Sequence, residues 1–466
     1  MKYGSTRGDA PVLDFAGVLV GGLALDGGLY VPLEWPTLSP DELRSFAGRP
    51  YAEVAAEVMW PFVAGSSFER GDFDRMVAAA YATFDHPDVV PLRPLPDGVW
   101  LMELHHGPTL SFKDVALQLV GRLLEHELAR TPAEVTVLGA TSGDTGSAAI
   151  EGCRDRAGIE LVMLHPHGRI SEVQRRQMTT VTAPNIHNLA VEGTFDDCQD
   201  LVKAAFADRP FREQVHLAAV NSINWARVAA QVVYYITTGV ALGAPDRPVS
   251  FSVPTGNFGN ILAADVARRM GLPVSQLIIA SNENDILTRT VDTGTMRLEP
   301  VQATTSPAMD IQVSSNFERL LYDLYGGQGR ELAADMVEFR ASGELTLTPA
   351  RHAALAGRFD AGSLTEPGVM EVIAATHAAD GTLVDPHTAV GLGVGRRLRA
   401  DAEVPLVALA CAHPAKFGDA VRVATGIDPA LPDRLSDLAA RPEQYDRVPA
   451  DLEEVESRIL AVTGRS

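Results

Sequence analysis

A single lysine stands where a turn leads into a helical pattern, within HHGPTLSFKDVALQ (105–118). Leu117 and Leu124 lie four and eleven residues after Lys113 and predict an apolar face beside it. The positive end of a helix dipole and burial both disfavour an ammonium group, so we expect Lys113 to have a lowered pKa. Such an amine suits Schiff-base chemistry. The alternative is an ordinary lysine whose amine reaches water. Ser111 is expected to cap the helix.

Two glycine-rich turns, each between a predicted strand and a predicted helix, are candidate anion sites. In PTGNFGN (254–260), Gly256 and Gly259 permit close approach of a ligand, and the free N–H groups of the helix start suit phosphate. No Gly-Lys-Ser follows, which excludes a P-loop, and GxGxxG is absent. TSGDTGS (141–147) could hold a carboxylate or phosphate through its hydroxyls and its helix start. The alternatives are plain turn chemistry for the first and ordinary helix capping for the second.

The stretch ACAHPAKFGDAV (410–421) carries a third set of polar residues at the end of an apolar run. Cys411 closes that run and has the ordinary interpretation of a buried thiol. His413 and Lys416 could supply positive charge or could be solvated. The histidines of HPH (165–167) have no nearby carboxylate or cysteine to complete a metal site, so none is expected there or elsewhere. No GxSxG signature is present.

The elements that position these residues alternate between strands and helices. Continuous apolar strands separated by helices of ten or more residues predict an α/β fold with parallel sheets covered on both faces. Ligands bind such sheets beyond the carboxyl ends of the strands, and all three unusual loops fall there. The predicted strands are 134–140, 160–165, 186–191, 249–254, 276–281 and 404–411.

Composition narrows the class of protein. The 466 residues carry a net charge of -21, which argues against nucleic acid or an acidic membrane surface as a partner. Three cysteines without CxxC spacing favour a reducing compartment. The start, MKYGSTRGDAPVLDF, lacks the order of a signal peptide. The longest uncharged stretch, 228–245, contains Gln231 and Pro245 and is predicted to be a buried helix rather than a membrane span. We expect a cytoplasmic protein.

Eight blocks in one order resemble the threonine synthases, of the longer type with an extra N-terminal domain, within the fold-type-II pyridoxal-phosphate enzymes. They are MKYGSTRG, GPTLSFKDVALQ, ATSGDTGSAA, VEGTFDDCQDLVKAAF, NSINWAR, VPTGNFGN, SPAMDIQVSSNFER and CAHPAKF. The resemblance implies two domains containing parallel sheets with the cofactor between them. The predicted ranges are a mainly helical N-terminal domain (1–95), a smaller α/β domain with TSGDTG (96–220) and a larger one with GNFGN and the last strand (221–466). Lys113 would stand at the domain junction.

The resemblance also implies roles for individual residues. Lys113 would hold pyridoxal 5'-phosphate covalently and act as the catalytic base. The cofactor phosphate would be bound by Gly256, Asn257, Phe258, Gly259 and Asn260. The part of the site that receives the substrate's α-carboxylate and the cofactor's ring oxygen would be lined by Thr141, Ser142, Asp144 and Thr145. The substrate phosphate would face Asn221 and Arg227. Cys411 would stand beside the pyridine nitrogen, where the family commonly has Thr, and Asp144 replaces the Asn of many superfamily relatives.

The activity implied by the resemblance is conversion of O-phospho-L-homoserine and water to L-threonine and phosphate, the last step of threonine biosynthesis, by a monomer or homodimer. One alternative is another enzyme of this fold, such as a serine or threonine dehydratase or a β-replacing synthase. The block NSINWAR and the N-terminal domain argue against this alternative. A second is a non-catalytic threonine-synthase-like protein, which would not need Lys113 and both anion loops. A third alternative is a nucleotide-binding protein. This sequence lacks the lysine and the acidic metal ligands that such a protein would carry after PTGNFGN.

Overall fold

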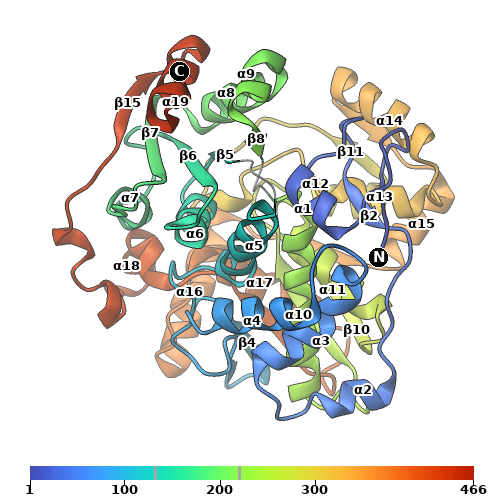
Figure 1. Ribbon diagram of the computed structural model, residues 1–466. Helices are drawn as coiled ribbons and strands as arrows, with labels where there is room; N and C mark the ends of the chain where they lie inside the picture. The colour runs from blue at the N-terminus through green and yellow to red at the C-terminus, as the bar shows by residue number, and fades with distance from the viewer. Residues whose placement is uncertain (131–133, 219–221, 466) are drawn as a thin grey trace.

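The computed structural model describes residues 1–130, 134–218 and 222–465. The N-terminal part is mainly helical, as expected, and it adds one small antiparallel sheet of β1 (Tyr3–Ser5) and β2 (Tyr30–Pro32). In Figure 1 its α3 and α4 lie beside α5 and α10 of the following unit. The N-terminal helices are α1 (Phe15–Gly21), α2 (Pro40–Ser45), α3 (Tyr51–Val63) and α4 (Arg70–Tyr81).

The larger sheet has six strands in the order β13-β10-β9-β14-β4-β3. All neighbours are parallel except β3, which pairs antiparallel with β4 at the edge. Because β9, β14 and β4 are parallel neighbours, the loops that follow them leave from the same edge of the sheet. The bounds are β3 (Leu92–Pro94), β4 (Val99–Glu103), β9 (Val249–Pro254), β10 (Val274–Ser281), β13 (Asp360–Ser363) and β14 (Leu406–Ala410).

The smaller sheet has five parallel strands in the order β15-β7-β6-β5-β8. Each of the six strands predicted from apolar runs corresponds to an observed strand of one of the two sheets, so the expected parallel α/β arrangement is confirmed. The short or edge strands β3, β4, β8, β13 and β15 were not predicted. The bounds are β5 (Val135–Ala140), β6 (Ile159–Pro166), β7 (Ile186–Glu192), β8 (Leu217–Ala218) and β15 (Asp446–Pro449).

Helices cover both sheets, and α10 lies almost wholly inside the molecule. It takes up most of the uncharged stretch 228–245, so the prediction of a buried core helix is confirmed. Over the described ranges, no helix combines the length and apolarity needed to cross a membrane. The helices are α5 (Lys113–Leu128), α6 (Asp144–Cys153), α7 (Glu172–Thr179), α8 (Phe195–Ala207), α9 (Arg209–Val215), α10 (Trp225–Ala241), α11 (Gly259–Arg269), α12 (Ile286–Thr293), α13 (Phe317–Leu324), α14 (Gly329–Ser342), α15 (Pro349–Ala356), α16 (Glu366–Asp380), α17 (Pro386–Leu398), α18 (Gly418–Thr425) and α19 (Leu452–Thr463).

The remaining elements are small. A two-stranded sheet pairs β11 (Thr295–Arg297) with β12 (Glu344–Thr346), and 3-10 turns occur at Pro307–Met309, Pro414–Phe417, Asp433–Leu435 and Leu438–Ala440.

The chain passes between the two sheets more than once. β4 belongs to the six-stranded sheet although it lies in the range 96–220, and β15 belongs to the five-stranded sheet although it lies in 221–466. Figure 1 shows the C-terminal α19 and β15 beside α8 and β7. The three-domain division therefore stays a proposal. Strand pairing places β4 with the larger domain and β15 with the smaller one, whereas the sequence ranges place them the other way round.

Two glycines allow α5 and α6 to approach within backbone contact. A Cβ added to Gly121 would lie 2.0 Å from the carbonyl oxygen of Gly152, and one added to Gly152 would lie 2.4 Å from the carbonyl oxygen of Leu117. Since α5 begins at Lys113 and α6 begins at Asp144, this contact sets how close the two helix starts lie.

We expect Gly121→Ala to destabilise the protein by about 1–3 kcal/mol, because the new methyl group must push two helix backbones apart. Thermal unfolding of the purified variant measures this as a lower apparent Tm. The matched control is Gly21→Ala at the end of α1, where an added Cβ meets nothing within 4 Å. Equal apparent Tm values for Gly121→Ala and the unmodified protein would contradict the close packing.

Candidate active site

The segments that carry Lys113 and Cys411 lie side by side at the carboxyl edge of the six-stranded sheet. The chain leaves β4 at Glu103 and β14 at Ala410, and an isolated bridge pairs Ser111 with Ala412. The Phe112 N–H donates to the carbonyl oxygen of Cys411 at 2.8 Å. The start of α5 is therefore fixed against the loop after β14, although the two are far apart in sequence.

Three buried charged side chains meet at this edge. Lys113 Nζ lies 3.6 Å from Oδ2 of Asp144, and Lys416 Nζ lies 2.8 Å from Oδ1 of the same carboxylate. Lys416 also donates to the carbonyl oxygen of Thr109 at 2.6 Å, and Gln174 Nε2 donates to Asp144 Oδ1 at 2.8 Å. Lys416 is 1% exposed, so the question left open by its sequence is decided: it supplies buried positive charge.

The cluster shifts the proton equilibria of its members. Burial lowers the pKa of Lys113; Asp144 opposes this effect, while the positive charges of Lys416 and Arg227 add to it. The expected lowering is confirmed. Burial alone would raise the pKa of Asp144, but Lys416 and Lys113 reverse the effect and hold that pKa well below its usual range. Asp144 therefore stays ionised while the Lys113 amine gains neutral, nucleophilic character.

The prediction that Ser111 caps α5 is wrong. Phe112 takes the N-cap position with helical backbone angles and no capping hydrogen bond from its side chain. The turn is fixed instead by Asp114, whose carboxylate accepts from the N–H and the hydroxyl of Thr109, each at 2.8 Å. The Ser111 hydroxyl is buried and has no hydrogen-bond partner among the residues that the structure describes.

The turn 256–260 presents a row of backbone donors at the start of α11. None of its five N–H groups donates to an acceptor among the described parts of the chain. Phe258 has a left-handed backbone (φ 62°) and is fully buried. A Cβ on Gly256 would lie 3.0 Å from the Ala308 carbonyl oxygen, so only glycine fits there without displacement. The free donors and the helix start fit a phosphate group.

Side chains behind this turn hold its shape. The Ser314 hydroxyl donates to the Gly256 carbonyl oxygen at 2.6 Å, and Asn316 Nδ2 donates to the Asn257 carbonyl oxygen at 3.0 Å. Asn260 Nδ2 donates to the Pro254 carbonyl oxygen at 2.8 Å. The carbonyl groups are thus bound on the protein side, which leaves the N–H side for a ligand.

The turn TSGDTGS combines helix capping with the charge cluster. Thr141 Oγ1 accepts from the N–H groups of Gly143 at 2.9 Å and Gly146 at 2.8 Å, so this buried hydroxyl stabilises the start of α6. Ser142 and Thr145 are partly exposed, and their hydroxyls make no hydrogen bond within the described ranges. Their predicted role in substrate binding stays a prediction.

Two of the remaining predicted residues, Arg227 and Cys411, lie close enough to Lys113 to influence its pKa. Arg227 is buried in the first turn of α10, and burial lowers its pKa to about 10. Asn221 lies outside the described residues. Cys411 is buried, and burial raises its thiol pKa well above the usual value, with Asp385 adding to the effect. A protonated, neutral thiol is compatible with the place predicted for it beside an unprotonated ring nitrogen.

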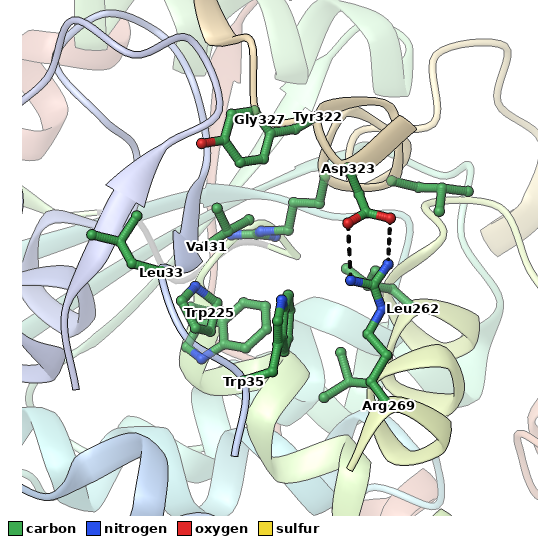
Figure 2. Close-up of a pocket in the computed structure, with 13 residues that line it drawn as sticks. Val31, Leu33, Trp35, Trp225, Leu262, Arg269, Tyr322, Asp323 and Gly327 are labelled. Carbon is green, nitrogen blue, oxygen red and sulfur yellow. Dashed lines mark hydrogen bonds and ion pairs between the residues drawn. The ribbon is translucent and has the colours of Figure 1, made fainter. Parts of the chain in front are cut away.

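A pocket of about 210 Å³ lies between the N-terminal part and the helices α10, α11 and α13. Figure 2 shows Trp35 beside Trp225, the first residue of α10, and the ion pair between Arg269 and Asp323, whose shortest distance is 2.7 Å. On its wall, Arg319 donates to the carbonyl oxygens of Tyr30 at 2.9 Å and Ile223 at 2.6 Å. The N-terminal part thus supports the segment that leads to Arg227.

Sequence reasoning missed several residues that build the site. Gln174 and Thr109 hold the charge cluster, and Asn316 bridges the carbonyl oxygens of Asn257 and Ser222, each at 3.0 Å. Asn316 stands in the recognised block SPAMDIQVSSNFER, which gave a usable signal. Thr109 stands in the recognised block GPTLSFKDVALQ, whereas Gln174 stands in a helical pattern outside the recognised blocks and carries no such signal.

Three family models match successive parts of the chain. "Threonine synthase N terminus" matches residues 2–81, "Pyridoxal-phosphate dependent enzyme" matches 88–375, and "Threonine synthase, C-terminal" matches 388–459. A threonine synthase from Pseudomonas aeruginosa is 51% identical over 458 residues, which cover 98% of this chain and 97% of that protein.

Solved structures are similar over the same length. A threonine synthase from Brucella melitensis with bound PLP has a TM-score of 0.96 and 48% identity, covering 99% of both chains. A yeast threonine synthase has a TM-score of 0.94 and 37% identity, covering 100% of this chain and 99% of that one. The similarity therefore includes both sheets and the N-terminal part.

Two substitutions should shift the pKa of Lys113 in opposite directions. Lys416→Met removes a nearby positive charge and should raise the pKa, whereas Asp144→Asn removes the negative partner and should lower it. The rate of modification of Lys113 by an amine reagent in the cofactor-free protein, followed against pH by mass spectrometry, measures both shifts. Lys203→Met, a change at an exposed lysine, is the control. Shifts of the same sign in both variants would contradict the assigned cluster.

Proposed function

The chain belongs to the threonine synthase family of pyridoxal-phosphate-dependent enzymes, and we propose that it converts O-phospho-L-homoserine and water to L-threonine and phosphate. The observation that carries the proposal is the buried Lys113, which has a lowered pKa and faces Asp144 at the edge where the turn 256–260 also lies. One reactive amine next to a phosphate-competent turn is the arrangement that this chemistry needs.

The cofactor is pyridoxal 5'-phosphate, and we propose a site for it among the groups described above. When bound, it supplies an electron sink that stabilises negative charge on the carbons next to the substrate nitrogen. We assign the covalent attachment to Lys113 and the phosphate to the N–H groups of 256–260. The Cys411 thiol, held neutral by burial, is assigned to the ring nitrogen because it adds no charge there.

The protein groups then have separable tasks. The Lys113 amine, once free, removes the proton from the α carbon and moves protons at the β carbon, and its lowered pKa suits both transfers. Loss of the β proton supplies the electron pair with which phosphate leaves the γ carbon; a proton returned to the γ carbon then forms the methyl group, water adds at the β carbon, and the α carbon regains its proton. The fixed charges of Asp144 and Lys416 keep the electrostatic surroundings of the amine constant through these steps.

Substrate recognition is assigned to the groups around the amine. Arg227, together with Asn221, is assigned to the substrate phosphate, since a guanidinium fork matches phosphate geometry. Thr141, Ser142 and Thr145 with the start of α6 are assigned to the α-carboxylate. Because Asp144 is ionised, it would repel that carboxylate, so we assign it to the lysine pair instead.

Location and assembly are part of the same proposal. Three free, buried cysteines support a reducing compartment such as the cytoplasm. The net charge of -21 supports a small-molecule substrate rather than nucleic acid. A monomer or homodimer is proposed, and light scattering of the purified holoenzyme tests it.

Product analysis tests the reaction and separates it from the alternatives. We expect the purified holoenzyme to release inorganic phosphate from O-phospho-L-homoserine and to form one L-threonine per phosphate. A dehydratase would instead form a 2-oxo acid from L-serine or L-threonine. A non-catalytic relative would give neither product.

Lys113→Ala should lose both the visible absorbance of the bound cofactor and turnover, because the amine assigned to the covalent attachment is gone and the nearby Lys416 amine is engaged by Asp144 and the Thr109 carbonyl oxygen. Absorbance spectra and the phosphate-release assay measure the two losses. Lys203→Ala, at an exposed lysine of α8, should keep both. Ordinary activity in Lys113→Ala would overturn the assignment of the catalytic lysine.

Arg227→Ala should weaken substrate binding by about 2–3 kcal/mol, roughly 30- to 150-fold in KM, through loss of charge-assisted hydrogen bonds to the phosphate. Cofactor affinity should change much less. Steady-state kinetics and cofactor titration measure these effects, with Arg75→Ala on α4 as the exposed control. An unchanged KM would remove Arg227 from the phosphate site.

A further inference from the structure

A cluster of histidine and carboxylate side chains lies where the chain leaves β4, ten residues or fewer before Lys113. Glu103, His105 and His106 each offer one ligand atom, and these atoms all lie within 4.8 Å of one another. The proposed reaction uses none of the three. Their residue types are those that bind transition-metal ions.

His106 faces a carboxylate with each of its ring nitrogens. Nδ1 lies 3.1 Å from Oδ1 of Asp85, and Nε2 lies 3.0 Å from Oε2 of Glu103. A neutral imidazole donates from only one nitrogen, so the second contact requires either a second proton or a cation. In metal sites, a ligating histidine commonly donates its other N–H to a carboxylate, which is the relation of His106 to Asp85.

His105 supplies a second imidazole beside the first. Its ring centroid lies 4.9 Å from that of His106 and 5.4 Å from that of His413. Its ring nitrogens make no hydrogen bond within the described parts of the chain. A ring nitrogen that is not engaged in a hydrogen bond is available to bind a metal ion.

The cluster opens into a pocket of about 500 Å³, which gives a hydrated ion access. His413 lines the same pocket, and its Nδ1 accepts the Ala415 N–H at 3.2 Å, while its Nε2 makes no hydrogen bond among the described residues. The second oxygen of Glu103 accepts from Arg93 Nε at 2.5 Å, so the carboxylate is held in one orientation. A rigid carboxylate and two imidazoles lower the cost of assembling a coordination shell.

We propose that Glu103, His105 and His106 bind one divalent transition-metal ion of the Zn²⁺ class, with Asp85 orienting His106. Two nitrogen ligands and one oxygen ligand match the preferences of Zn²⁺, and the pocket leaves a position for water or His413. The ion fixes the segment 103–106 after β4 and, through His106, its contact with Asp85, so it stabilises the holoenzyme. This site is independent of the proposed reaction and does not rest on it.

Calorimetric titration of chelator-treated holoenzyme with Zn²⁺ tests the proposal. We expect one saturable site per chain and a higher apparent Tm with bound Zn²⁺. Co²⁺ in place of Zn²⁺ should give the visible absorption bands of a low-symmetry site. His105→Asn and Glu103→Gln should each weaken binding more than tenfold, and Asp85→Asn should weaken it about 10- to 100-fold.

The matched control is His187→Asn, in a partly exposed pair whose Nε2 lies 2.8 Å from Glu160 Oε2. That pair is not part of a three-residue cluster among the described residues, so Zn²⁺ affinity should not change. Retained cofactor absorbance shows that each variant is folded. Absence of a saturable site, or unchanged affinity in both His105→Asn and Glu103→Gln, would overturn the proposal.

Discussion

The carboxylate of Asp144 lies between two buried lysine amines, Lys113 at 3.6 Å and Lys416 at 2.8 Å. Removing one partner from a buried ionic group leaves uncompensated charge and costs several kcal/mol, so these three side chains must stay together. They come from the segments after β4, β5 and β14, which belong to both sheets. The charge balance therefore fixes the two sheets relative to each other, and with them the place of the reactive amine.

The same constraint explains how one lysine can be buried and reactive. Burial lowers the pKa of Lys113, the ionised Asp144 limits that effect, and Lys416 neutralises part of the carboxylate. A buried lysine without any charged partner would lose its positive charge entirely, and a buried lysine paired with a single carboxylate would keep that charge. The three-charge arrangement lies between these limits, where an amine can both give and take protons. The turn 256–260 complements it with uncharged N–H donors, which can bind a phosphate without adding a fourth full charge.

Much of the fold was predictable because it depends on local pattern. The apolar runs predicted six strands, and the uncharged stretch 228–245 predicted the core helix α10. The prediction failed where a tertiary contact overrode a local preference. Ser111 has the residue type of a helix cap, but Thr109 and Asp114 hold that turn instead. The pairing of β15 with β7 depends on the arrangement of the whole sheet, so the four residues of β15 do not reveal which strand they pair with.

The sequence by itself determined the residue chemistry: a lysine at a helix start, two glycine-rich turns after strands, and the blocks that identify the family. These features depend on neighbours within one turn or one loop. The tertiary structure alone decided which distant groups meet. Lys416 and Thr109 are 307 residues apart yet hydrogen-bonded, and the same lysine reaches Asp144. Likewise, His106 faces Asp85, 21 residues away, only because the chain folds back there. Electrostatic and packing energies depend on distance in space, so the sequence supplied the groups and the fold supplied their pKa values and partners.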